Sequence, residues 1–111
     1  MIHLPDAPKL TPVGQIEPLT EGAKFTALCS AQRGSLPLSF KWAKNGLELN
    51  GNVSNRILIK QFTGTLSILE IEAVRRSDAG NYTCRVSNSF GSDQVASLLN
   101  IKCKTLRKQT I

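Results

Sequence analysis

Histidine is almost absent from this sequence: His3 is the only one, and it lies in an N-terminal end, residues 1–6, that we expect to be disordered. Neither a Ser/His/Asp nor a Cys/His set for nucleophilic catalysis can therefore be assembled. A Walker loop, a dinucleotide-binding fingerprint and a zinc-spaced cluster of cysteine and histidine are missing too. These absences argue against an enzyme, a bound cofactor and a metal site.

Long apolar runs are also missing, since no stretch approaches the roughly 20 residues that a membrane-spanning helix needs. Residues 1–5 have neither the charged start nor the apolar centre of a signal peptide. We therefore expect no direct membrane insertion and interpret the chain as a piece of a longer protein. Two N-glycosylation sequons, at Asn52 and Asn81, are compatible with secretion.

Positive charge dominates, with a formal net charge of +6. Four of the basic residues lie at the C-terminal end: Lys102, Lys104, Arg107 and Lys108. The rest of the chain holds ten basic and eight acidic residues, a nearly balanced surface. No aromatic side chains alternate with the charges, as stacking on single-stranded nucleic acid would require. We expect residues 103–111 to form a basic tail or interdomain linker, and we expect no nucleic acid partner.

The stretch from Leu69 to Cys84 combines a strand, a tight corner and a second strand that carries a cysteine. Leu69 and Ile71 are two residues apart and share one face of a strand. Tyr82 precedes Cys84 by two residues, so both point to the same side, and the tyrosine hydroxyl can bond back to the backbone of the corner. This is the pattern of a tyrosine corner. Asp78 is best explained by that corner, paired with Arg56 or Arg76.

A second cysteine and a tryptophan lie upstream at matching positions. Phe25, Ala27 and Cys29 alternate onto one face of a strand, and Phe40 and Trp42 do the same on the next. The dipeptide Asn45-Gly46 predicts a type I′ hairpin turn. Strands are expected at residues 7–13, 14–19, 23–32, 38–44, 47–49, 55–61, 65–72, 80–88 and from about 93 to 102.

The order Cys, Trp, Tyr, Cys at these spacings resembles immunoglobulin domains of the intermediate set, over residues 7–102. The resemblance implies an all-β Greek-key sandwich of two antiparallel sheets. It also implies a disulfide between Cys29 and Cys84 and a core around Trp42, Tyr82, Leu69 and Ile71.

Three segments narrow the resemblance to one family: residues 34–46, 66–71 and 78–84. They are similar to immunoglobulin domains of the Down syndrome cell adhesion molecule (Dscam) family, in particular to its shortened invertebrate members. That family implies the extracellular part of a plasma-membrane receptor that binds homophilically between cells. In the shortened members, the N-terminal immunoglobulin domain varies between isoforms and pairs with itself.

Strand parity predicts where such pairing would occur. If Leu69 and Ile71 point inward, then Thr65 and Ser67 do as well, while Leu66 and Ile68 point outward. Leu28, next to inward Cys29, and Leu58 would join them on the outer face of the sheet that the family calls ABED. We interpret these four aliphatic residues as the interface of an antiparallel homodimer with a two-fold axis. Two alternatives are a bulge in the strand at 65–72 that returns Leu66 to the core and a neighbouring immunoglobulin domain that covers the sheet.

Two other functions remain open. A structural domain of an intracellular muscle filament would use the same scaffold with Cys29 and Cys84 as thiols. A heterophilic immune or guidance receptor would instead use the loops at 33–37 and 89–92. Cys103 is left over, and we expect it to be unpaired, with an intermolecular disulfide as the alternative.

Overall fold

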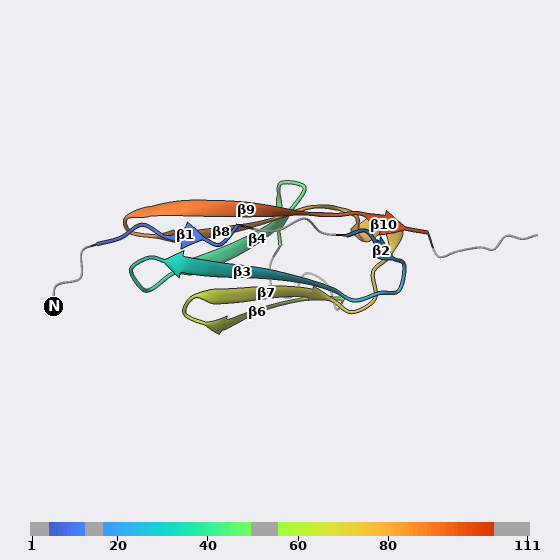
Figure 1. The fold of residues 1–111 in the computed structure, drawn as a ribbon, viewed down its shortest axis with the longest axis horizontal. Coiled ribbons are helices and arrows are strands. Elements are labelled where there is room, and N and C mark those ends of the chain that lie inside the picture. The colour runs from blue at the N-terminus through green and yellow to red at the C-terminus, as the bar shows by residue number, and fades with distance from the viewer. Residues whose placement is uncertain (1–4, 13–16, 50–55, 104–111) are drawn as a thin grey trace, which may run out of the picture.

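The computed structural model describes residues 5–12, 17–49 and 56–103, which form two packed four-stranded antiparallel β-sheets and a short two-stranded parallel pair (Figure 1). This confirms the predicted all-β sandwich. The strands are β1 (Lys9–Leu10), β2 (Leu19–Thr20), β3 (Phe25–Arg33), β4 (Ser39–Lys44), β5 (Leu47–Leu49), β6 (Ile57–Thr63), β7 (Leu66–Ile71), β8 (Gly80–Asn88), β9 (Gly91–Leu99) and β10 (Ile101–Lys102), with a short 3-10 helix, η1 (Arg76–Asp78), before β8.

The first sheet has the strand order β1-β3-β7-β6, and burial alternates along its central strand β7. Ser67, Leu69 and Ile71 are buried, and the residues between them are partly exposed. The predicted parity of this strand is therefore correct from Ser67 onward. Thr65, which was expected to point inward, is exposed. It precedes β7 in a turn, where its N–H donates a hydrogen bond to Thr63 Oγ1 at 3.1 Å.

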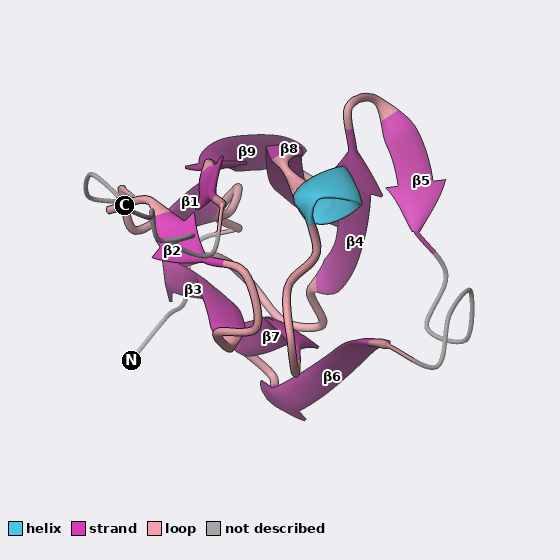
Figure 2. Cartoon of the chain, turned by 90° about the vertical axis from the view of Figure 1, so that its right-hand side faces the viewer, coloured by secondary structure: helices cyan, strands magenta, loops and turns pink. Residues whose placement is uncertain are grey.

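The second sheet has the order β5-β4-β8-β9 and lies across the core from β3, β7 and β6 (Figure 2). Strands β8 and β9 pair along their whole length, from Gly80 opposite Leu99 to Asn88 opposite Gly91. The hairpin between β4 and β5 turns at Asn45 and Gly46, whose φ angles are 50° and 86°. Both positive values are those of the predicted type I′ turn.

The chain changes sides near its start, as predicted, but through shorter strands than expected. β1 pairs with β3, whereas β2 pairs in parallel with β10, which follows β9. Pro8 and Pro12 flank β1 and have no N–H to donate to a ladder, which limits the strand to two residues. Residues 14–16 of the second expected strand lie outside the described residues.

The core lies between the sheets around a disulfide from Cys29 on β3 to Cys84 on β8. The predicted bridge is thus confirmed. Trp42 on β4 is 3% exposed, and its Nε1–H donates a hydrogen bond to Ser67 Oγ at 2.9 Å. This bond satisfies the one polar atom of the indole ring across the sandwich. Leu69, Ile71 and Tyr82 are fully buried in the same cluster.

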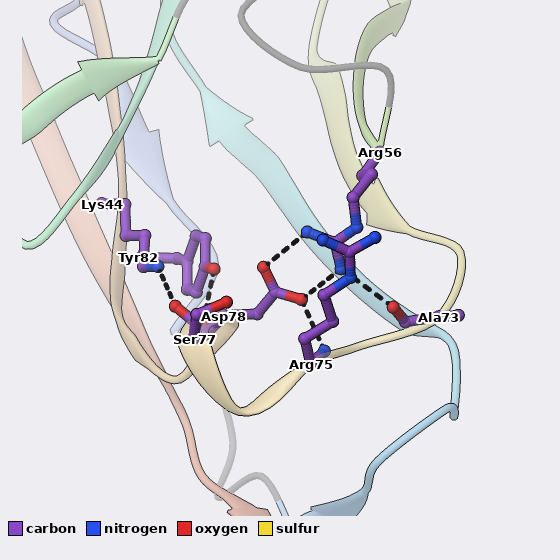
Figure 3. A network of polar contacts seen from close by, with 7 residues as sticks. All are labelled: Lys44, Arg56, Ala73, Arg75, Ser77, Asp78 and Tyr82. Atoms are coloured by element: carbon purple, nitrogen blue, oxygen red, sulfur yellow. Dashed lines mark hydrogen bonds and ion pairs between the residues drawn. The ribbon is translucent and has the colours of Figure 1, made fainter.

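The corner before β8 is held by a polar network (Figure 3). The Tyr82 hydroxyl donates a hydrogen bond to the Asp78 carbonyl at 2.6 Å. The Asp78 carboxylate accepts two bonds from the Arg56 guanidinium, at 2.6 and 3.0 Å, and one from the Arg75 N–H at 2.7 Å. Of the two partners expected for Asp78, Arg56 is therefore the one that binds it. This ion pair connects the corner to β6, which Arg56 immediately precedes.

The same network shifts the pKa values of Asp78 and Tyr82 and raises that of Arg56, whose guanidinium donates hydrogen bonds to Asp78. Burial by itself favours the neutral form of Asp78, but the hydrogen bonds from Arg56 and from the Arg75 N–H outweigh it and lower the pKa of the carboxyl. Burial, aided by the Asp78 charge, raises the pKa of Tyr82 to about 12. The corner therefore holds a carboxylate and a neutral phenol at physiological pH.

Candidate interaction surface

Apolar side chains gather on the outer face of β3, β7 and β6. Leu28 on β3 pairs with Ile68 on β7, and Ser30 pairs with Leu66 one step further along. On the other side of β7, Lys60 pairs with Ile68, and Leu58 pairs with Glu70. These registers bring Leu28, Leu58, Leu66 and Ile68, the four predicted interface residues, onto one contiguous face.

The four residues differ in exposure. Leu28 is 57% exposed and Leu58 is 48% exposed, whereas Leu66 and Ile68 are half-buried between their neighbours. The side chains of β7 therefore form the floor of the surface, and Leu28 and Leu58 stand on either side of them. A contact to this face would dehydrate all four.

A fifth apolar residue, Phe62, belongs to the same face and was not predicted. Its ring is 59% exposed, and Lys60 Nζ lies 5.6 Å from the ring centroid, so the two side chains share the outer side of β6. Phe62 is the extra residue of a bulge in β6, because Gln61 pairs with Ser67 and Thr63 pairs with the next residue, Leu66. We call Leu28, Leu58, Phe62, Leu66 and Ile68 the outer patch.

The bulge lies in β6 and not in β7. The alternative of a bulge at 65–72 that returns Leu66 to the core is therefore wrong. The pairing of β7 with β3 continues without a break to Leu66 opposite Ser30. Leu66 therefore keeps its outward position and is not returned to the core. A signal for Phe62 was present in the sequence, because Leu58, Lys60 and Phe62 continue the period of two, but the strand was expected to end at Gln61.

Charged groups lie at the border of the outer patch and within it. Lys24 Nζ and Glu70 Oε2 are 3.6 Å apart on the row below Leu28 and Ile68. Lys60 lies between Leu58 and Phe62 along β6. An exposed pair of this kind adds little to stability but can select the orientation of a partner.

The opposite outer face, on β4, β5, β8 and β9, is more polar. Lys41 and Glu48 form an exposed ion pair at 3.9 Å, and Arg85 donates a hydrogen bond to Ser92 Oγ at 3.2 Å. Asn81, one predicted glycosylation site, is exposed on this face of β8, whereas Asn52 lies outside the described residues. Among the described residues, no group of histidine, cysteine and acidic side chains is placed to hold a metal ion.

Two further sites bear on the alternative functions. Leu36 and Phe90, in the loops considered for heterophilic binding, are 64% and 52% exposed. They lie at the end of the sandwich where β3 joins β4 and β8 joins β9. Cys103 is exposed and not disulfide-bonded within the chain.

A family model described as an immunoglobulin domain matches residues 7–88. The chain belongs to the immunoglobulin domain family. Members of this family and its structural neighbours are binding or structural domains, and this domain is accordingly not an enzyme. Within the described residues, no helix is long and apolar enough to cross a membrane.

The relatives of this immunoglobulin domain include cell-surface proteins by name. It is 30% identical over 99 residues to the cell adhesion molecule Dscam1 of Drosophila melanogaster. It is 31% identical over 102 residues to the mast/stem cell growth factor receptor kita of Danio rerio. These matches cover 86% and 88% of this chain but only 5% and 10% of the two relatives. The chain therefore corresponds to a small part of each.

Solved structures give the same fold. The crystal structure of the Dscam1 Ig7 domain, isoform 5, matches with a TM-score of 0.80 and 26% identity, over 86% of this chain and 97% of that one. Titin domain M4 matches with a TM-score of 0.79 and 24% identity, over 90% of this chain and all of that one. The titin match shows the fold alone. The sequence and structure matches to Dscam1 together confirm the predicted resemblance to Dscam-type domains.

Proposed function

We propose that this immunoglobulin domain is a homophilic recognition module in the extracellular part of a plasma-membrane adhesion receptor. The observation that carries the proposal is the outer patch, which is apolar, contiguous and partly exposed on one sheet face. Soluble domains seldom leave such a surface without a partner. The match to a cell adhesion molecule over 86% of the chain supports the same role.

The arrangement of charges favours one way of pairing two copies. A two-fold axis that crosses the strands at Ile68 would stack Lys60 of one copy on Lys60 of the other. An axis halfway between Leu66 and Ile68 instead sets Leu66 against Ile68 of the second copy and Phe62 against its Lys60. The second arrangement removes the like-charge contact and adds a cation–π contact. We therefore propose an antiparallel dimer in the second register.

The expected affinity of one pair is low. Fully burying a leucine or isoleucine contributes about 1.5–3 kcal/mol, but association costs several kcal/mol in lost motion. Because the chain spans 5% of its Dscam1 relative, neighbouring immunoglobulin domains are expected beside it. Many receptors acting in parallel would then supply the strength of adhesion.

Ile68→Asp tests the proposal by placing a charge at the centre of the outer patch. Sedimentation of the wild-type domain over a concentration series should show a monomer–dimer equilibrium, and the variant should stay monomeric. Leu28→Asp, at a more exposed position, should act in the same way with less effect on folding. Leu47→Asp is the matched control, because Leu47 is 75% exposed on β5, away from the patch. A wild-type domain that remains monomeric, or dimers that survive both patch variants, would contradict the proposed pairing.

The heterophilic alternative has its own outcome in this experiment. If the patch variants still dimerise or the receptor still binds cells, binding does not depend on the outer patch. Substitutions of Leu36 and Phe90 would then test binding through the loops. The titin M4 match, at 24% identity, shows the fold alone and does not separate the filament alternative from an extracellular role. The filament alternative requires Cys29 and Cys84 to be thiols, so the mass of the isolated domain before and after reduction and alkylation separates it from an extracellular role.

A further inference from the structure

The Asn81-Tyr82-Thr83 sequon lies in the first half of strand β8 rather than in a loop. Tyr82 points inward and is fully buried, while Asn81 is exposed and Thr83 is half-buried on the opposite side of β8. The first and third residues of the sequon therefore face outward together. They lie on the sheet that does not carry the outer patch.

The backbone around Asn81 is fixed by the neighbouring hairpin turn. The Asn81 N–H donates a hydrogen bond to Asn45 Oδ1 at 2.9 Å, and the Asn45 N–H donates one to the Asn81 carbonyl at 2.8 Å. The side chain of Asn81 therefore leaves the surface from a defined position. A bulky group attached to it would extend over the outer face of β8 and β9.

That face contains an exposed leucine next to the sequon. Leu98 on β9 pairs directly with Asn81 and is 55% exposed. Beyond Thr83, a shallow depression is lined by polar and small side chains that include Ala43, Arg85 and Gln94. A sugar carries both an apolar face and polar hydroxyl groups. It can therefore cover an apolar side chain that lies beside a polar depression.

We propose that Asn81 carries an N-linked glycan that covers Leu98 and shields the outer face of β8 and β9. In the transfer step, the side-chain amide nitrogen of Asn81 bonds to the anomeric carbon of a lipid-pyrophosphate-linked oligosaccharide. The nitrogen loses one proton, and the bond from the anomeric carbon to the lipid pyrophosphate breaks. The glycan does not cover the outer patch, because that patch lies on the other side of the sandwich. The outer patch therefore remains the open apolar face.

The occupancy of Asn81 is tested by mass spectrometry on the chain secreted from eukaryotic cells behind a cleavable leader. Peptide N-glycosidase in heavy-oxygen water converts a glycosylated asparagine to labelled aspartate, which peptide mapping then locates. Wild type and Thr83→Ser, which keeps the sequon, should be labelled at Asn81, and Thr83→Ala should not. Folded, secreted wild type with unmodified Asn81 would overturn the proposal.

The shielding role is tested on the glycosylated domain before and after enzymatic removal of the glycan. Removal should increase the fluorescence of a hydrophobic dye bound to the domain, and Leu98→Ser should abolish that increase. Dye binding that does not respond to removal would contradict the shielding. This role rests on the proposed pairing through the outer patch, so sedimentation is run on both forms. A glycan found at Asn81 in a domain that never dimerises would refute the pairing alone, whereas a bare Asn81 in a dimer would refute the glycan alone.

Discussion

The side chain of Ser67 is a small group that determines how Trp42 packs. It is 2% exposed, and its hydroxyl is the acceptor for the indole N–H at 2.9 Å. Because both atoms are out of contact with water, the tryptophan has no solvent partner to replace the serine. The bond also connects the two sheets, since Trp42 lies on β4 and Ser67 on β7.

We expect Ser67→Ala to lower the free energy of unfolding by about 1–3 kcal/mol, the cost of leaving a buried donor without an acceptor. Urea denaturation followed by tryptophan fluorescence measures the loss. Ser30→Ala is a suitable control, because Ser30 lies on the outer side of β3 and is half-buried. Its effect should stay within about 0.5 kcal/mol. Equal effects of the two substitutions would mean that the Trp42 hydrogen bond contributes nothing of its own.

At the scale of structural elements, the corner from η1 to β8 is the unit with the clearest pH response. The folded state raises the pKa of Tyr82 to about 12 from an ordinary value of 10.0. Between these values, the folded chain binds a proton that the unfolded chain has lost. The resulting contribution to stability is complete below pH 10 and is lost as the pH rises toward 12.

Tyr82→Phe isolates this contribution, because it keeps the ring that packs 5.5 Å from Phe25 and removes only the hydroxyl. At neutral pH, wild type should be more stable than the variant by about 1–3 kcal/mol, since the Asp78 carbonyl loses its donor. That difference should shrink steadily above pH 10. Urea unfolding of both proteins from pH 7 to 11 provides the comparison. A difference in stability that stays constant over this range would show that folding does not raise the pKa of the Tyr82 phenol.

The elements that the sequence predicts well are those bounded by clear turn signals. Strand β8 has the predicted bounds, 80–88, and β5 has the predicted 47–49. The bulge at Phe62 was missed because the strand was expected to end at Gln61 and because the extra residue shows only in the register of β6 against β7. The sequence could not decide whether Arg56 or Arg76 binds Asp78. Arg56 is 22 residues from Asp78 in the chain, and only the folded structure brings the two together.

The disulfide is a property of the whole molecule, because it closes a loop between residues 55 positions apart and joins the two sheets. In the chain-entropy model, a loop of this length stabilises the folded state by about 4 kcal/mol. That is a large share of the roughly 5–15 kcal/mol that holds a typical domain folded.

The paired substitution of Cys29 and Cys84 by alanine should therefore lower the free energy of unfolding by about 4 kcal/mol. Thermal and urea unfolding of the variant and of wild type would measure the change. Cys103→Ser serves as the control for loss of a thiol, and because Cys103 is exposed it should have little effect. A paired variant as stable as wild type would indicate that the two cysteines are not bridged in the folded protein.

The bulge at Phe62 has a consequence for how copies of this domain can assemble. Among the described residues, β6 has a paired strand on one side only, so its other rim exposes unpaired backbone groups. The extra residue makes the spacing of those groups irregular, and Lys60 adds a charge next to it. The bulge and the charge oppose the addition of an incoming strand at that end of the rim. Copies of this domain are thus discouraged from adding strands at this end of β6.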